Sequence, residues 1–206
     1  MDKHTDNPEA VLDFWFAGPR DDIALMTARY DVWFTVNPAF DQEIRQRFGD
    51  ILTAAEHGEL KHWKLSASGT LALILVCDQF PRNVYRATPR AFALDVRAQA
   101  LARDGVALGI DRELGIVERS FFYLPFEHAE DRDAQALSVR CFETLHAEAP
   151  APFKALTADA LHWARDHHDI VARFARLPHR NLILDRPSTP EEVAWLAAHR
   201  NSYGQG

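Results

Sequence analysis

The sixteen residues LALILVCDQFPRNVYR, positions 71 to 86, decide how this chain can fold. The first six are all apolar, and the segment becomes polar from Asp78 onward. An unbroken apolar run bounded by polar residues predicts a fully buried element, here a helix. Pro81 stands where the polar side chains gather, and the residue before a proline avoids helical backbone. We therefore predict a central buried helix that ends near Phe80, with polar side chains crowded at its exit.

A second segment near the C-terminus repeats the chemistry of that exit. Residues 177–181, Leu-Pro-His-Arg-Asn, again place an Arg-Asn pair directly after an apolar helical pattern. Arginine presents five donors in a planar fork, and asparagine supplies both donors and an acceptor. The two segments are alike in chemistry and far apart in sequence. We predict that both face one cleft, where Arg82 and Arg180 present two guanidinium groups to a carboxylate or a phosphate.

The predicted ligand-binding residues come from these two segments. They share side chains that can hold or orient an anion: Asp78, Arg82, Asn83, Arg86, His179, Arg180 and Asn181. Two structural interpretations stay open beside this one. Asp78 and Arg82, four residues apart, can form a salt-bridged network that only locks a helix end. Each Arg-Asn pair can also satisfy the free carbonyl groups of its own helix end.

A third segment, residues 121–131, joins aromatic side chains to a run of acids. Glu127 and His128 are the candidate catalytic pair, acting as general acid and base. The alternative is that Pro125 begins a helix here, so that the acids only stabilise the positive end of its dipole. The acids can also pair with Arg82 or Arg180, which would make the cluster structural. This cluster lacks the Glu-x-x-His order that di-iron bundles use on paired helices, the chain has no His-Glu-x-x-His motif, and we predict no metal site.

Capping signals divide the rest of the chain into helices. Asn7, Asn37 and Thr189 each precede a proline, which is typical of a helix start. Apolar residues recur at spacings of three and four, over the longest stretch from Phe153 to Leu177. We predict an all-α fold of about nine helices packed as antiparallel pairs, in a single domain spanning residues 1–206. Residues 1–7 and 202–206 are expected to be flexible.

Composition narrows the class of protein. A formal net charge of −7, from 23 basic and 30 acidic residues, disfavours nucleic-acid binding, which requires a basic surface. No run reaches the roughly 18 apolar residues of a membrane-spanning helix, and residues 1–8 have neither the basic nor the apolar region of a signal peptide. Cys77 and Cys141 stand among apolar residues without Cys-x-x-Cys spacing, as expected of buried thiols in a reducing compartment. We expect a cytoplasmic protein with no membrane or nucleic-acid partner.

Other conspicuous residues are interpreted as core. Seven aromatic side chains are expected to be buried: Trp15, Phe16, Trp33, Phe34, Phe121, Phe122 and Tyr123. His167 falls on the apolar stripe of the longest helix and is interpreted as a hydrogen-bonded core histidine. The chain has no glycine-rich phosphate loop and no Gly-x-Ser-x-Gly motif, so we expect no cofactor and no serine hydrolase chemistry.

Five motifs of this sequence are characteristic as a set: residues 12–16 (LDFWF), Trp33-Phe34 with Phe40-Asp41, residues 78–83 (DQFPRN), residues 123–128 (YLPFEH) and residues 178–181 (PHRN). Together they resemble the DUF924 family, a bacterial domain of unknown function, over about residues 11–196. The resemblance implies a TPR-like all-α fold, in which helix pairs stack as a superhelix-type bundle, and it implies no activity. The chain departs from the family pattern at Ala175, Leu177 and Asp185, where glycine, phenylalanine and glycine are common.

These observations favour a binding module. Its pocket, lined by arginine, asparagine and histidine, would take a small molecule or a peptide that bears a carboxylate or phosphate. Two alternatives stay open: a small enzyme that uses Glu127 and His128 as acid and base, and a polar cluster that is purely architectural. A closed pocket favours the enzyme, and an open groove favours a peptide-binding module. The identity of the ligand and the oligomeric state are open at this stage.

Overall fold

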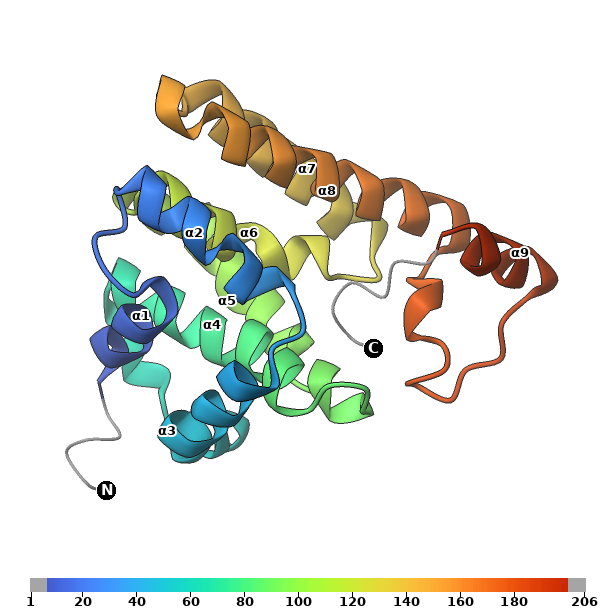
Figure 1. Cartoon of the computed structure of the whole chain (residues 1–206), viewed down its shortest axis with the longest axis horizontal. Helices are drawn as coiled ribbons and strands as arrows, with labels where there is room; N and C mark the ends of the chain where they lie inside the picture. Colours follow the sequence, from blue (N-terminus) through green and yellow to red (C-terminus); the bar gives the residue numbers. More distant parts are fainter. Residues whose placement is uncertain (1–6, 200–206) are drawn as a thin grey trace.

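The computed structural model describes residues 7–199, and all regular structure within that range is helical. Its nine α-helices are α1 (Pro8–Phe16), α2 (Ile23–Phe34), α3 (Pro38–His57), α4 (Ala67–Val84), α5 (Asp95–Leu108), α6 (Ile116–Glu127), α7 (Arg132–Glu148), α8 (Lys154–Phe174) and α9 (Pro190–Ala198) (Figure 1). Short 3₁₀ turns lie between them: η1 (Lys61–Leu65), η2 (Pro89–Phe92), η3 (Ile110–Glu113), η4 (Ala151–Phe153) and η5 (Pro178–Arg180). The predicted all-α class and helix number are confirmed for the described residues. The flexibility predicted for the two ends falls mainly on residues 1–6 and 202–206, which lie outside that range.

The predicted capping residues begin their helices. Asn7 starts α1 by accepting a hydrogen bond from the backbone N–H of Glu9 at 3.1 Å. Thr189 starts α9 in a reciprocal pair with Glu192, in which each side chain accepts from the other residue's backbone N–H. Such caps satisfy donors that the first helical turn leaves without a partner. Local sequence therefore sets these helix boundaries.

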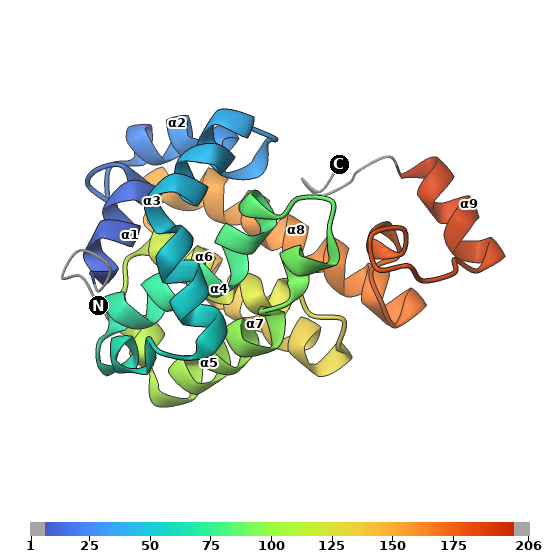
Figure 2. The ribbon, with the colours of Figure 1, turned by 90° about the horizontal axis from the view of Figure 1, so that it is seen from below.

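Helix α4 is the centre of the molecule. Every residue from 70 to 84 is buried, as the apolar run predicts. Helices α1, α3, α5 and α6 pack around it, and they surround it in the view from below (Figure 2). A helix that is apolar all round must be covered on every side, so this segment organises the fold.

Two prolines that were expected to mark helix boundaries lie inside helices. Pro81 is part of α4, which continues to Val84, and Pro125 is part of α6, which continues to Glu127. A proline removes one backbone hydrogen bond, but the turns on both sides of Pro81 and Pro125 are buried, and that packing outweighs the loss. The polar residues that follow Pro81 therefore project from the last turn of a helix, with defined directions, rather than from a loop.

The aromatic core forms where α1, α2, α4 and α6 meet. Trp15 is fully buried, and its ring meets that of Phe121 edge-on with centroids 5.6 Å apart. Trp33 from α2 meets the same Phe121 ring at 4.8 Å. The predicted aromatic core is confirmed except for Phe34, which is 44% exposed. Phe34 lies at the edge because only Met26 and Trp33 of α2 are buried, so this helix covers the core from outside.

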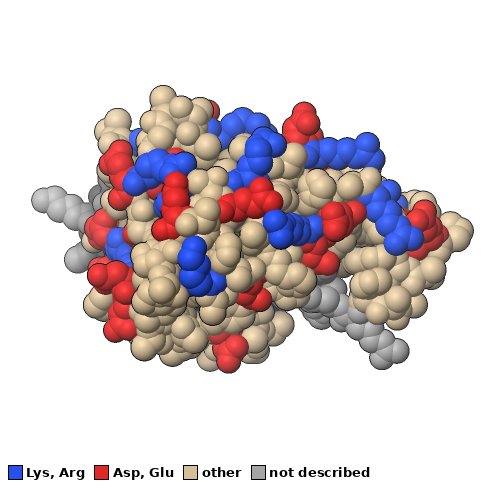
Figure 3. Space-filling view, turned by 90° about the horizontal axis from the view of Figure 1, so that it is seen from above, with Lys and Arg blue, Asp and Glu red and all other residues tan. Residues whose placement is uncertain are grey.

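Helices α7 and α8 form a long pair beside the α1–α6 body (Figure 1). Beyond α8 the chain turns back through η5, so that residues 178–180 approach α4 and α6. The return is held by Arg186, whose Nη1 lies 2.6 Å from Glu130 Oε2 near the start of α7. Basic and acidic side chains are interspersed on the face shown in Figure 3. Among the described helices, none is both long and apolar enough to span a bilayer.

Candidate functional site

A cavity of about 320 Å³ lies where α2, α4, α6, α8 and η5 meet. Most of the residues predicted to form a site line it: Arg82, Asn83, Arg86, Glu127, His128, His179 and Arg180. The volume is at the lower end of the range of small-molecule pockets, about 300–1,000 Å³. The three polar segments predicted to meet therefore do so, at a cavity rather than along an extended groove.

Asp78 and Asn181 do not line the cavity. Asp78 is 1% exposed and lies behind the wall, where it accepts hydrogen bonds from Gln79 Nε2 at 2.7 Å and His128 Nδ1 at 2.9 Å. Asn181 is also 1% exposed, and its Oδ1 accepts from Arg186 Nε at 3.1 Å. Both residues hold the segments that surround the cavity. The structure thus separates them from the residues that a ligand could touch.

Arg82 is held by two buried acids. Its Nη1 and Nη2 donate to the two carboxylate oxygens of Asp95 at 2.7 and 2.9 Å, and its Nη1 lies 3.3 Å from Asp78. Burial by itself would lower the pKa of Arg82, but Asp78 and Asp95 outweigh it and raise that pKa. Such a paired and buried guanidinium stabilises the junction of α4 and α5.

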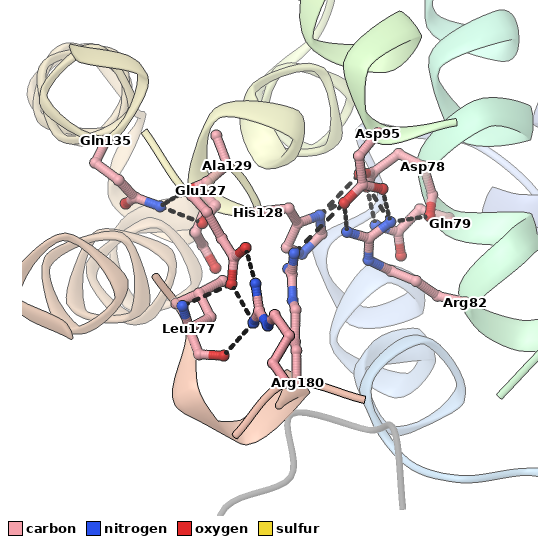
Figure 4. Close-up of polar contacts among 12 residues, drawn as sticks. Asp78, Gln79, Arg82, Asp95, Glu127, His128, Ala129, Gln135, Leu177 and Arg180 are labelled. Carbon is pink, nitrogen blue, oxygen red and sulfur yellow. Dashed lines mark hydrogen bonds and ion pairs between the residues drawn. The ribbon is translucent and has the colours of Figure 1, made fainter. Parts of the chain in front are cut away.

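Arg180 is buried without comparable pairing. It is 5% exposed, and its hydrogen bond from Nη1 to Asp95 Oδ2 is 3.5 Å long. Its Nε has no hydrogen-bond partner within the described part of the chain. Its guanidinium carbon lies 4.6 Å from the centre of the Phe92 ring. Figure 4 shows the side chain rising from η5 past His128 toward Asp95. Burial, and then the charge of Arg82, lower the pKa of Arg180 to about 10, so it is still a cation at neutral pH.

Asn83 and Arg86 share a third acid, Asp41 of α3. Asn83 Nδ2 donates to Asp41 Oδ1 at 2.8 Å, and Arg86 Nε donates to Asp41 Oδ2 at 2.6 Å. Arg90, which could have shared a helical face with Arg82 and Arg86, lies in η2 instead. It pairs with Glu56 at 2.9 Å and does not line the cavity. Helix α4 ends at Val84, so arginines spaced four residues apart at 82, 86 and 90 do not lie on one helical face.

His128 is oriented by Asp78. Its Nδ1 lies 2.9 and 3.0 Å from the two carboxylate oxygens, so Nδ1–H donates and Nε2 is left to act as a base. Burial, and then the charge of Arg82, lower the pKa of His128, so its ring is neutral at neutral pH. Burial would raise the pKa of Asp78, but Arg82 and His128 outweigh it and lower that pKa, so Asp78 stays ionised.

Glu127 is a buried acid at the end of α6, not at a helix start. It is 5% exposed, and its Oε1 lies 3.4 Å from His167 Nδ1. Burial, and then the negative charge of Asp78, raise the pKa of Glu127 to about 8, so the carboxyl group is protonated at neutral pH. The proposed dipole role fails here, because a helix C-terminus carries partial negative charge. Glu127 therefore needs another explanation.

Two further histidines face the cavity. His167 lines it and also donates from Nδ1 to the carbonyl oxygen of Trp163 at 3.0 Å, so it is both buried and part of the site. Burial, and then the charge of His128, lower the pKa of His167 to about 3. Burial, and then Arg180, lower the pKa of His179 to about 2. Both rings are neutral at neutral pH. Within residues 7–199 no group of three or more His, Cys, Asp or Glu side chains is placed to hold a metal ion.

Most of the cavity wall could not be predicted from the sequence. Phe92 lines the cavity and lies against both arginines, and Asp95, which does not line the cavity, pairs with both; nothing in the spacing of Phe92 and Asp95 marks them. The remaining wall consists mainly of aromatic and apolar side chains whose sequence pattern predicts a core, together with a few polar residues such as Gln79 and the pair formed by Tyr30 Oη and Asp159 Oδ2 at 2.5 Å. An aromatic residue that lines a cavity has the same sequence signature as one that fills a core. The sequence therefore contains no pattern that would identify these aromatic residues as part of a cavity wall.

The second Arg-Asn segment lies between two left-handed residues. Ala175 ends α8 with φ 58°, and Asp185 follows η5 with φ 51°. These are the positions where the resembling family commonly has glycine, the residue that adopts positive φ without a steric penalty. The backbone thus keeps a left-handed conformation at both places although neither residue is glycine.

Comparison with known proteins agrees with the motifs. Residues 11–200 match the family described as bacterial protein of unknown function (DUF924). A solved structure of the protein of unknown function ATU0120 from Agrobacterium tumefaciens is 38% identical, with a TM-score of 0.79, over 93% of this chain and 97% of that one. None of the curated proteins searched matches. The match over nearly the whole chain, with the motifs that surround the cavity, shows that this chain belongs to the DUF924 family.

Proposed function

We propose that this protein binds a small molecule bearing a carboxylate or phosphate group in the cavity between α2, α4, α6, α8 and η5. The observation that carries the proposal is Arg180. It is a buried cation that lines the cavity, with one hydrogen bond of 3.5 Å and an Nε without a partner in the described structure. Buried donors left unsatisfied are destabilising, and a bound anion would supply the missing acceptors.

The size of the cavity favours a small molecule over an extended peptide. Its volume of about 320 Å³ is closed in by side chains from five helices and two 3₁₀ turns. A peptide ligand would therefore insert a terminal carboxylate or one side chain rather than lie along a groove.

We also propose that the paired helices, such as α7 with α8, represent a compact TPR-like arrangement. We further propose that the protein works in the cytoplasm.

A second candidate, an enzyme, is favoured by one specific observation. Asp78 orients His128 through Nδ1, as a carboxylate does in many catalytic histidine pairs. A neutral His128 could accept a proton while protonated Glu127 donates one, and acid and base groups with pKa values shifted apart are typical of active sites. The architectural alternative is supported for Arg82, whose bonds to Asp95 need no ligand.

The test is binding of two simple probes, sodium butanoate and inorganic phosphate, measured by thermal shift at constant ionic strength. Either probe is expected to raise the Tm of the wild-type chain, because ligands that bind only the folded state stabilise it. Arg180→Met is expected to abolish that rise. Arg90→Met is the matched control, because Arg90 is 53% exposed in its pair with Glu56 and does not line the cavity.

The results separate the alternatives. A Tm rise that survives Arg180→Met unchanged would contradict the proposal. So would a flat response of the wild-type chain to both probes up to high millimolar concentration, which would favour the architectural explanation. Equal loss in Arg90→Met and Arg180→Met would indicate general electrostatic screening rather than a site.

A further inference from the structure

The cavity lining is divided into two chemically different halves. One half is polar and carries arginine, amide, acid and histidine groups from Gln79, Arg82, Asn83, Arg86, Glu127, His128, His167, His179 and Arg180. The other half is aromatic and aliphatic, formed mainly by Tyr30, Trp33, Phe34, Val117, Phe121, Leu124, Phe142, Leu156, Ala160 and Trp163. An inorganic anion would contact only the first half, so the second half needs its own explanation.

The division runs along two helices. On α6 the lining changes from Phe121 to Glu127 over six residues, which is about 9 Å along the helix axis. On α8 it changes in the same direction, from Leu156 through Trp163 to His167. The contact of 3.4 Å between Glu127 and His167 shows that the polar ends of the two helices lie together.

The aromatic ends lie together as well. Trp33 of α2 lies with its ring centroid 4.8 Å from that of Phe121, and the Phe34 ring is nearly parallel to Phe121 at 6.1 Å. The polar atoms in this half are already engaged. Tyr30 Oη bonds Asp159, and Ser120 Oγ donates to the carbonyl oxygen of Ile116 at 3.2 Å. This half therefore presents chiefly apolar surface to the cavity.

The polar half can compensate one negative charge on a ligand. Arg82 is bonded through both Nη atoms to Asp95, and Arg86 is bonded to Asp41. Arg180 alone among these arginines lacks a close carboxylate partner. Asp78 is ionised and Asp95 is ion-paired with Arg82 nearby, so a second negative charge on a ligand would be repelled. Carboxylate and phosphate can both pair with a guanidinium fork, so it is this repulsion that favours a carboxylate monoanion over a phosphate dianion.

We propose, on the basis of the anion-binding function above, that the ligand is a monocarboxylate with an aromatic or bulky apolar body. Its carboxylate lies against Arg180, and its body lies in the half formed by Trp33, Phe121 and Trp163. The length of about 9 Å along α6 between Phe121 and Glu127 sets the separation between the two ends. The protonated carboxyl group of Glu127 can donate a hydrogen bond to the bound carboxylate.

The experiment compares probes that vary the apolar body, the charge and the kind of acid group, using isothermal titration calorimetry on the full chain. The probes are 4-phenylbutanoate, butanoate, 4-phenylbutanamide and phenyl phosphate. We expect 4-phenylbutanoate to bind about 30-fold or more tightly than butanoate, because burying the ring removes apolar area from water. We also expect it to bind more tightly than the uncharged amide and the phosphate.

Phe34→Ala tests the apolar half without threatening the fold, because Phe34 is 44% exposed. This variant is expected to weaken 4-phenylbutanoate about fivefold and to leave butanoate unchanged. Val96→Ala is the matched control, since Val96 is an 80% exposed apolar residue that does not line the cavity. It should leave both affinities unchanged. An equal effect of Phe34→Ala on both probes would contradict the assignment of the ring to this half.

The outcomes distinguish this inference from the function on which it rests. Equal affinity for butanoate and 4-phenylbutanoate would overturn the apolar body and leave anion binding standing. Tighter binding of phenyl phosphate would overturn the monocarboxylate and also leave anion binding standing. Binding of the amide as tightly as the acid, or no binding of any probe, would overturn both.

Discussion

The two Arg-Asn segments of this protein both follow a proline and are chemically alike, but they differ in structure. Arg82 and Asn83 project from the last turn of α4, and Arg82 is fully engaged by Asp95 and Asp78. Arg180 and Asn181 lie at η5, between two left-handed residues, and Arg180 has one long bond to the same Asp95. Asp95 thus accepts two short hydrogen bonds from Arg82 and one long hydrogen bond from Arg180.

The difference in hydrogen bonding between Arg82 and Arg180 suggests different roles for the two side chains. A buried ion pair with both partners satisfied stabilises the native packing and has little left to offer a ligand. A buried cation with unused donors is destabilising by itself and is retained where something else supplies acceptors. This contrast supports a structural role for Arg82 and is consistent with our proposal that Arg180 meets a ligand.

The largest expected effect is on the free energy of unfolding, measured by chemical denaturation. Arg82→Met is expected to lower it by about 3–5 kcal/mol, because Asp78 and Asp95 would stay buried without their cation. Arg180→Met is expected to change it by less than about 1 kcal/mol, because Asp95 keeps Arg82 and a poorly paired buried charge is removed. Equal losses in the two variants would break the comparison.

The second test asks whether Glu127 is protonated in the folded chain. A protonated Glu127 carries no charge, which would explain why it does not act as a carboxylate partner for Arg180 although both line the cavity. The pKa of Glu127 is about 8 in the folded chain and has an ordinary value of 4.5, raised by burial and by Asp78, Asp166 and Asp159. The folded state therefore holds a proton that the unfolded state has lost. Its stabilising contribution is full below pH 4.5 and is lost as the pH rises through 8.

We expect the wild-type free energy of unfolding to fall by roughly 4 kcal/mol between pH 5 and pH 9 on account of Glu127. In Glu127→Gln the side chain is neutral at every pH, so this fall should disappear. Below pH 6.5 both proteins should lose stability, because the lowered pKa values of His167 and His179 mean that the unfolded state binds protons first. An unchanged alkaline slope in the variant would show that Glu127 is ionised at neutral pH.

The smallest expected effect concerns the backbone around the second segment. Ala175→Gly and Asp185→Gly should each raise the free energy of unfolding by up to about 1 kcal/mol, because glycine adopts positive φ without strain. Ala87, at φ 54° just after the first segment, should respond in the same way. Ala158→Gly, at an exposed position inside α8, is the control and should lower stability by about 1 kcal/mol. Losses at 175 and 185 would mean that these side chains make contacts that outweigh the strain.

Local patterns predicted much of this architecture. The apolar run at 71–76 required a covered central helix, and the Asn-Pro and Thr-Pro signals marked helix starts, since capping depends on residues within one turn. The same local logic failed at Pro81 and Pro125. Whether a helix passes through a proline depends on the packing around it, which a local pattern does not contain.

The sequence by itself determined the helical class, the buried α4 and the polar residues available for a site, because these depend on periodicity and side-chain chemistry. Only the tertiary structure decided which polar residues meet, that Asp95 is shared between Arg82 and Arg180, and that Phe121 and Trp163 also line a cavity. The physical reason is that pairing, desolvation and enclosed volume depend on distances between segments far apart in the chain. Identical Arg-Asn pairs therefore acquired different surroundings.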